Sequence, residues 1–227
     1  MNTRPSFGVP FKVIAAAALA LLFVPMQTVG QQNVVTQKDY DDPREMRNLP
    51  DYCKHTQLFR DHLPGGNDPE QIARWTNVLG PMFIHLHHYC WGLMATNRAF
   101  FMSRTPDDRH YNLEMSIDEF DYVIRHSSPD FSLLPEILTK KGENLISLDQ
   151  GPKGVAELRG AIDIRPDYWP PYAAISDYFK QNGDFTKARE WIEKGLSAAP
   201  NTRPLERRLA EIKSAQGNRT KSPQAPR

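Results

Sequence analysis

A repeated pattern in the C-terminal half constrains the fold of this chain more than any other feature. Pro166 and Pro200 are about 34 residues apart, which is the period of repeats built from paired helices. A similar run of small and apolar residues leads to each proline: Gly160-Ala161-Ile162-Asp163-Ile164-Arg165-Pro166 and Lys194-Gly195-Leu196-Ser197-Ala198-Ala199-Pro200. Helix pairs of this kind bury their apolar faces only by stacking on neighbouring pairs. The pattern therefore predicts an all-α fold built as a short solenoid.

The repeat also carries large and small residues where helix pairs need them for packing. In the later copy these are Tyr172, Ile175, Ser176, Phe179, Ala188, Ile192 and Pro200. In the earlier copy they are Gly142, Leu145, Gly154, Leu158, Ala161 and Pro166. With these residues, the chain resembles the tetratricopeptide repeat family, in its exported bacterial type, over residues 135–200. The resemblance implies antiparallel helix pairs whose first helices line a concave groove.

Helix-starting and helix-ending residues divide the rest of the chain. Asp68 and Pro69 form an N-cap followed by a first-turn proline, and Gly80-Pro81 ends that helix. Helices are expected near 50–62 and 69–79, from Met82 to Ser103, and over 107–126. The predicted units are an N-terminal helical cap (49–81), a divergent helix pair (82–134), two repeats (135–168 and 169–202), a capping helix (203–216) and a disordered tail (217–227).

The N-terminus has the pattern of a secretory signal over residues 1–30. Arg4 and Lys12 precede an uncharged apolar run from Val13 to Met26, and small residues follow up to Gly30. The run is shorter than the roughly 20 residues of a membrane-spanning helix. We expect cleavage after Gly30, a flexible leader over 31–48, and a periplasmic or secreted protein. The alternative is an uncleaved anchor in the inner membrane, with the protein facing the periplasm.

The two cysteines, Cys53 and Cys90, favour a disulfide bond. An even number of cysteines in an exported chain is typical of disulfide pairing, because that compartment is oxidising. The alternative is a pair of buried free thiols. A bond would join the N-terminal cap to the first helix pair.

Composition and motifs argue against several classes of function. Lys plus Arg number 28 and Asp plus Glu 27, so no bulk charge attracts nucleic acid. The chain has no nucleophile elbow, phosphate-binding loop or dinucleotide fingerprint. We therefore expect a protein that is not an enzyme, needs no cofactor, and serves as a scaffold or assembly factor.

The resemblance also indicates where a partner from the cell envelope would bind. By register, the groove positions are Thr139, Lys140, Glu143 and Ile146 in one repeat, and Ala173, Asp177 and Lys180 in the next. Their mixture of small, charged and apolar side chains suits a protein or peptide. Trp169 lies beside the rigid Pro170-Pro171 corner and is a candidate for the same surface. Alternatively, these residues are merely exposed helix positions.

A second hypothesis concerns metal or redox chemistry in the segment from His85 to Cys90. His85 and His88 share one helix face and could bind zinc or copper. A third ligand would come from His55, His62 or His110. The zinc-protease pattern and the haem attachment motif are absent. The alternative is that these rings cap and fill an amphipathic helix.

Overall fold

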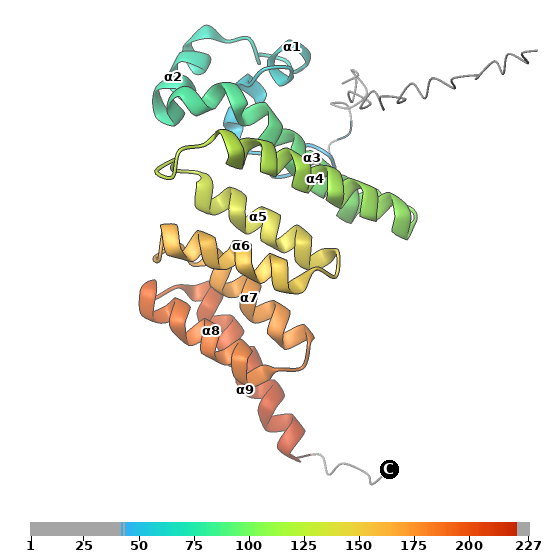
Figure 1. Ribbon diagram of the computed structural model, residues 1–227, viewed down its shortest axis with the longest axis vertical. Coiled ribbons are helices and arrows are strands. Elements are labelled where there is room, and N and C mark those ends of the chain that lie inside the picture. The colour runs from blue at the N-terminus through green and yellow to red at the C-terminus, as the bar shows by residue number, and fades with distance from the viewer. Residues whose placement is uncertain (1–41, 43, 222–227) are drawn as a thin grey trace, which may run out of the picture. The chain divides into compact units, whose positions relative to one another are not determined.

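The computed structural model describes residues 42 and 44–221, and their side chains as far as Gly217. Over these residues the chain is helical and contains no strand. The elements in chain order are η2 (Asp51–His55), α1 (Phe59–His62), α2 (Pro69–Leu79), η3 (Gly80–His85), α3 (Leu86–Phe101), α4 (Pro106–His126), α5 (Leu134–Ser147), α6 (Gly151–Ile164), α7 (Pro170–Gln181), α8 (Phe185–Ala198) and α9 (Arg203–Lys221) (Figure 1).

Local sequence explains where several helices begin. The Asp68 carboxylate accepts hydrogen bonds from the backbone N–H groups of Glu70 and Gln71, and Pro69 opens α2. Thr105 caps α4 in the same way, with Pro106 in its first turn. Such caps satisfy N–H groups that have no partner inside the helix. The predicted helices over 69–79 and 107–126 agree with α2 and α4, whereas the segments expected to be helical over 50–62 and 82–103 each contain a 3-10 helix (η2, η3) followed by an α-helix.

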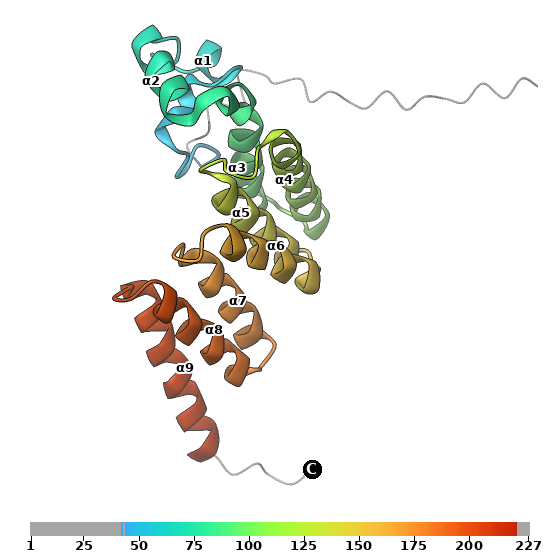
Figure 2. The same ribbon diagram turned by 60° about the vertical axis from the view of Figure 1, so that its left-hand side comes forward.

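Consecutive helices pack in pairs, α3 with α4, α5 with α6 and α7 with α8, and α9 packs on α8 (Figures 1 and 2). Glycine permits a close approach between α5 and α6. A Cβ atom on Gly142 would lie only 2.8 Å from the carbonyl oxygen of Gly154. The two backbones therefore touch at the small residues that the repeat pattern placed there. The prediction of an all-α, repeat-like solenoid is confirmed.

Two apolar clusters form the core. One contains side chains of η2, α3, α4 and α5, including Leu86, Phe120 and Ile137, and the other joins α7, α8 and α9 through residues such as Ile192 and Leu205. The predicted disulfide is confirmed: Cys53 and Cys90 are bonded, with Cα atoms 5.7 Å apart. The bond ties η2 to α3 and so fixes the N-terminal cap to the first helix pair.

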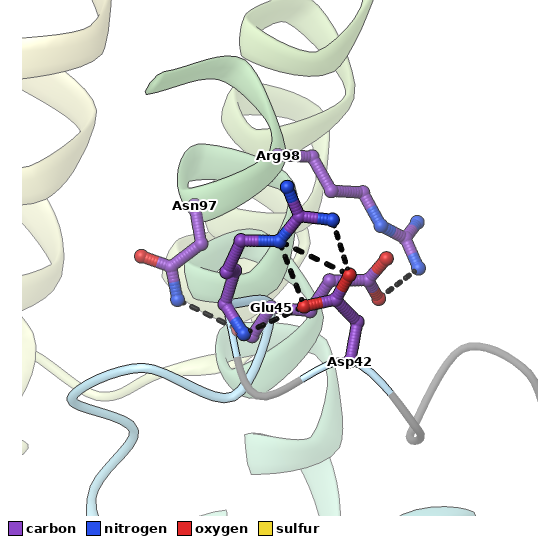
Figure 3. Close-up of polar contacts among 5 residues, drawn as sticks. Asp42, Glu45, Asn97 and Arg98 are labelled. Carbon is purple, nitrogen blue, oxygen red and sulfur yellow. Dashed lines mark hydrogen bonds and ion pairs between the residues drawn. The ribbon is translucent and has the colours of Figure 1, made fainter. Parts of the chain in front are cut away.

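The last part of the predicted leader is ordered, so the expectation of a flexible segment is wrong for residues 44–48. Arg98 Nη2 donates to Glu45 Oε2 at 2.8 Å, and Glu45 is buried. The Asn97 amide donates to the carbonyl oxygen of Glu45 (Figure 3) and also to that of Arg47. Polar contacts hold this segment against α3. The prediction of a flexible leader was based on the lack of regularly spaced apolar residues, and that spacing does not reveal polar contacts. The remainder of the leader lies outside the described residues.

The C-terminal helix is longer than expected. We predicted a capping helix over 203–216 and a disordered tail from residue 217, but α9 continues to Lys221. A single glycine such as Gly217 weakens a helix without ending it.

The predicted signal segment (1–30) lies outside the described residues. Within the described part of the chain, no helix is both long enough and apolar enough to cross a membrane.

Candidate functional site

The predicted groove residues of α5 include one exposed ion pair. Lys140 Nζ lies 3.0 Å from Glu143 Oε2, and both side chains are about two-fifths exposed, at 40% and 41%. The two residues are one helical turn apart, a spacing that brings opposite charges together. Solvent-exposed pairs of this kind contribute little to stability, about 0–1 kcal/mol. Their charges therefore remain accessible to a partner at little cost to the fold.

The equivalent residues of α7 are linked to α9. Asp177 Oδ2 lies 3.0 Å from Arg208 Nε, and Lys180 Nζ lies 3.5 Å from Glu211 Oε2. Asp177 and Lys180 also pair with each other at 3.4 Å. Asp177 stands one repeat period after Glu143, so the same repeat position is charged and half-buried on both helices. Four predicted residues thus carry half-exposed charges on the first helices of the two repeats, and we call them the charged face: Lys140, Glu143, Asp177 and Lys180.

Two other predictions at this face are wrong because the side chains are buried. Thr139 is 1% exposed, and its hydroxyl donates to the carbonyl oxygen of Pro135 at 2.7 Å. Ala173 is 3% exposed and belongs to the core cluster of α7, α8 and α9. The two residues stand one repeat period apart and so occupy the same repeat position. This position therefore serves helix packing in both repeats, and it is not available to a ligand.

Ile146 and Trp169 are also placed differently from the prediction. The Ile146 side chain lies against α6, since a Cβ atom on Gly154 would come within 2.7 Å of Ile146 Cγ1. Trp169 is half-buried and packs against the core cluster that contains Tyr172. Both side chains therefore support contacts between helices. The charged face does not include them.

Sequence reasoning missed a carboxylate at the start of α5. Glu136 is half-buried, and its Oε1 accepts a hydrogen bond of 2.7 Å from the hydroxyl of the fully buried Tyr89. Burial and the Glu136 carboxylate together raise the pKa of Tyr89 and of Tyr52, and raise the pKa of Tyr168 to about 12. Glu136 precedes Lys140 by one turn, so its place beside the charged face could have been read from helical spacing.

His85 and His88, the histidines of the metal hypothesis, lie in a row of ring contacts with Tyr122, His126 and His87. His88 stacks on Tyr122 with ring centroids 3.6 Å apart, Tyr122 stacks on His126 at 4.1 Å, and His126 stacks on His85 at 4.8 Å. His87 lies next to His88 at 4.2 Å. Tyr122 therefore separates His88 from His126 and His85. We call these five rings the histidine ladder.

Hydrogen bonds fix several rings of the ladder. His87 Nδ1 donates to the carbonyl oxygen of Ile84, and His88 Nδ1 lies 2.6 Å from Glu119 Oε2. Burial lowers the pKa of His85, with further contributions from His126 and His88. Burial also lowers the pKa of His87 to about 4. For His85 and His87, these environments favour neutral imidazole rings.

Two of the suggested third metal ligands, His55 and His110, are engaged elsewhere. His55 Nδ1 donates to the carbonyl oxygen of Gly66, and His110 Nε2 lies 3.1 Å from Glu114 Oε1. Over the described residues, no group of three His, Cys, Asp or Glu side chains converges as metal ligands would. The ladder stacks η3 and α3 against α4, which agrees with the alternative that these rings fill a helix surface.

A hollow of about 610 Å³ lies where α4, α5 and α6 meet. Lys141 projects into its wall between two carboxylates, 2.6 Å from Asp121 and 2.7 Å from Glu157. Burial alone would lower the pKa of Lys141, but these two hydrogen bonds raise it above its usual value. The lysine therefore stays charged and joins all three helices. The hollow is thus lined by an ion-pair network that stabilises the stack.

Comparisons with known proteins assign neither a family nor a function to this chain. No family model matches the chain, and no curated protein matches its sequence.

Proposed function

We propose that this protein is a tetratricopeptide-like scaffold that binds a protein or peptide of the cell envelope along the charged face. The observation that carries the proposal is the arrangement of Lys140, Glu143, Asp177 and Lys180 on the first helices of two successive repeats. Half-exposed charges of both signs on neighbouring helices offer a partner several polar contacts, and such contacts provide specificity.

The disulfide supports the location that the proposal requires. Disulfides persist in oxidising compartments such as the periplasm and are rare in the cytosol. A periplasmic or secreted location is therefore part of the proposal, with the N-terminal segment as signal or anchor. Cell fractionation with antibody detection and mass measurement of the N-terminus would test this part. Recovery of the chain in the cytosol with reduced cysteines would contradict it.

Crosslinking in cells tests the binding role. The tagged full-length chain would be compared with a variant in which Lys140 and Glu143 are both changed to Ala. Because the two charges are exposed and pair with each other, their joint removal leaves the fold intact and the net charge unchanged. We expect specific envelope proteins to crosslink to the parent and to be lost from the variant.

A matched control comes from α8. Glu190 and Lys194 are exposed, one turn apart and opposite in charge, but they lie outside the charged face. Changing both to Ala should leave the crosslinked proteins unchanged. The proposal fails if the partners of the parent survive the α5 variant, or if both variants lose them equally.

A further inference from the structure

The hollow where α4, α5 and α6 meet combines an apolar lining with charged side chains. Leu145 and Leu148 of α5 and Ile117 of α4 provide apolar contacts. The volume of about 610 Å³ lies within the range of roughly 300–1,000 Å³ that is typical of ligand pockets. A hollow of this size can hold a whole side chain, so its charges decide which kind of side chain fits.

Negative charge predominates around the hollow. Its lining contains four carboxylates, from Glu114, Asp118, Asp121 and Glu157, and two lysines, Lys141 and Lys153. Both lysines are engaged within the hollow. Lys141 Nζ lies between Asp121 and Glu157, at 2.6 and 2.7 Å. Lys153 Nζ donates to Gln150 Oε1 at 2.9 Å. The hollow therefore carries an excess of negative charge that its own lysines leave in place.

The excess is concentrated at Asp118, on the exposed rim. Over the described residues its carboxylate has no hydrogen bond and no ion pair. Burial raises the pKa of Asp118, and the carboxylates of Asp121, Glu114 and Glu119 raise it further. Arg125 acts in the opposite direction. Glu114 and Asp121 each lie one helical turn from Asp118, so like charges repel one another along this side of α4. A cation in the hollow would relieve that repulsion.

We propose that this hollow binds an arginine side chain of a protein or peptide partner. The aliphatic part of that side chain lies on Leu145 and Leu148, and its guanidinium group is bound at the rim by Asp118 and Glu114. The hollow is lined by α4 and α6 as well as α5, whereas the charged face belongs to α5 and α7. The inference thus goes beyond the proposed function and adds a second, separate contact.

The chemistry of the hollow favours a guanidinium group over an ammonium group. A guanidinium group donates two parallel hydrogen bonds to one carboxylate, and both oxygens of Asp118 are available for them. It is also more weakly hydrated than an ammonium group, so it loses less on entering a partly enclosed site. Its methylene groups cover apolar surface while the charge stays near water, which matches an apolar lining below an acidic rim.

Nuclear magnetic resonance of the full-length chain with labelled isoleucine and leucine methyl groups would test the hollow. The probe is a short alanine peptide with one central arginine and with both termini blocked, so that the side chain carries its only charge. One matched peptide has lysine in place of arginine. Another has citrulline, which keeps the shape of arginine without its charge.

We expect saturable shifts of the Ile117, Leu145 and Leu148 methyl signals with the arginine peptide. The lysine peptide should bind more weakly, and the citrulline peptide should cause no saturable shift. The methyl signals of Ile192 should not move with any peptide, because Ile192 lies in the core cluster of α7, α8 and α9.

Asp118→Asn should weaken the binding of the arginine peptide about tenfold or more, because hydrogen bonds between two charged groups are lost. Asp118 is exposed, so the fold should be preserved. Asp107→Asn is the matched control. Asp107 is also exposed and lies in the first turn of α4, outside the hollow, and its substitution changes the net charge by the same amount. This variant should bind as the parent does.

The inference is overturned if no saturable shift occurs, or if the lysine or citrulline peptide binds as tightly as the arginine peptide. It is also overturned if Asp118→Asn binds unchanged, or if Asp107→Asn weakens binding equally. Its failure is distinguishable from failure of the proposed function, which depends on the proteins that crosslink to the charged face. The Lys140/Glu143 variant should bind the arginine peptide as the parent does, and loss of this binding would contradict two separate sites.

Discussion

The carbonyl oxygen of Gly142 on α5 faces the Cα atom of Gly154 on α6 so closely that a Cβ atom on Gly154 would lie 2.6 Å from it. Real Cβ atoms do not approach a carbonyl oxygen to this distance, so the two helices would have to separate. Gly154→Ala should therefore destabilise the protein by about 1–3 kcal/mol, as expected for overpacking in a dense core. Urea unfolding followed by circular dichroism measures this change.

Gly160 on the same helix gives a matched control. A Cβ atom there would meet only Leu138 Cδ1, at 3.8 Å, which is an ordinary contact. Gly160→Ala should therefore stabilise the protein by about 0.5–1 kcal/mol, because alanine is the better helix former. Equal effects of the two substitutions would contradict close backbone contact between α5 and α6.

The Cys53–Cys90 bond should stabilise the N-terminal cap more than the repeats. It closes a loop with a sequence separation of 37 residues, and such a bond contributes about 2–4 kcal/mol. Changing both cysteines to Ala should increase hydrogen exchange in η2 and α2, with little change in α7 and α8. This difference is expected because nearest-neighbour stacking makes stability local in repeat proteins. Uniform loss of protection along the chain would show that the cap and the repeats unfold as one unit.

The contact between Glu45 and Arg98 should anchor the segment that leads into the cap. Glu45→Ala leaves the Arg98 guanidinium without this carboxylate in a half-buried position, and should cost about 1–3 kcal/mol. The segment over residues 44–48 should then be cut faster by trypsin at Arg47. Asp42→Ala is the control, because over the described residues the Asp42 carboxylate contacts the exposed Arg44, two residues later, and not α3. If both variants are cut at the parent's rate, the polar contacts in Figure 3 do not hold the segment.

Much of the fold could be predicted from the sequence because it depends on local signals. Prolines, N-caps and the repeat period fix where helices begin and which small residues meet, as at Gly142 and Gly154. The disulfide followed from the number of cysteines and the exported context. The close-packed positions of the repeat were assigned correctly for the same reason, since the period relates them by simple counting.

The candidate site could be predicted only in part, because it depends on contacts between distant segments. The register indicated Glu143 and Asp177, but it could not show that Thr139 and Ala173 face the core. That depends on how neighbouring helices approach. The Tyr89–Glu136 bond joins two segments far apart in the sequence, and no local pattern predicts it. The ordering of the chain at Glu45 was missed for the same reason.

The histidine ladder predicts how stability depends on pH. Burial lowers the pKa of His87 from 6.5 to about 4 and lowers the pKa of His85 in the same direction. Between pH 6.5 and about pH 4, the unfolded chain binds a proton at His87 and the folded chain does not. The free energy of unfolding must then decrease as the pH falls from about 6.5 to 4, because protons bind preferentially to the unfolded state.

Urea unfolding at several pH values between 7.5 and 4.5 would measure this decrease. Carboxylates also titrate in acid, so the His87→Gln variant is needed to separate the contribution of His87 from theirs. The variant removes one proton-binding group, so its stability should fall less steeply with decreasing pH than that of the parent. His110→Gln is the control, because His110 is exposed on α4, is not part of the ladder, and pairs with Glu114. A parent and a His87→Gln variant with identical slopes would mean that His87 takes up its proton equally in the folded and unfolded chains. The stacked rings would then impose no barrier to protonation.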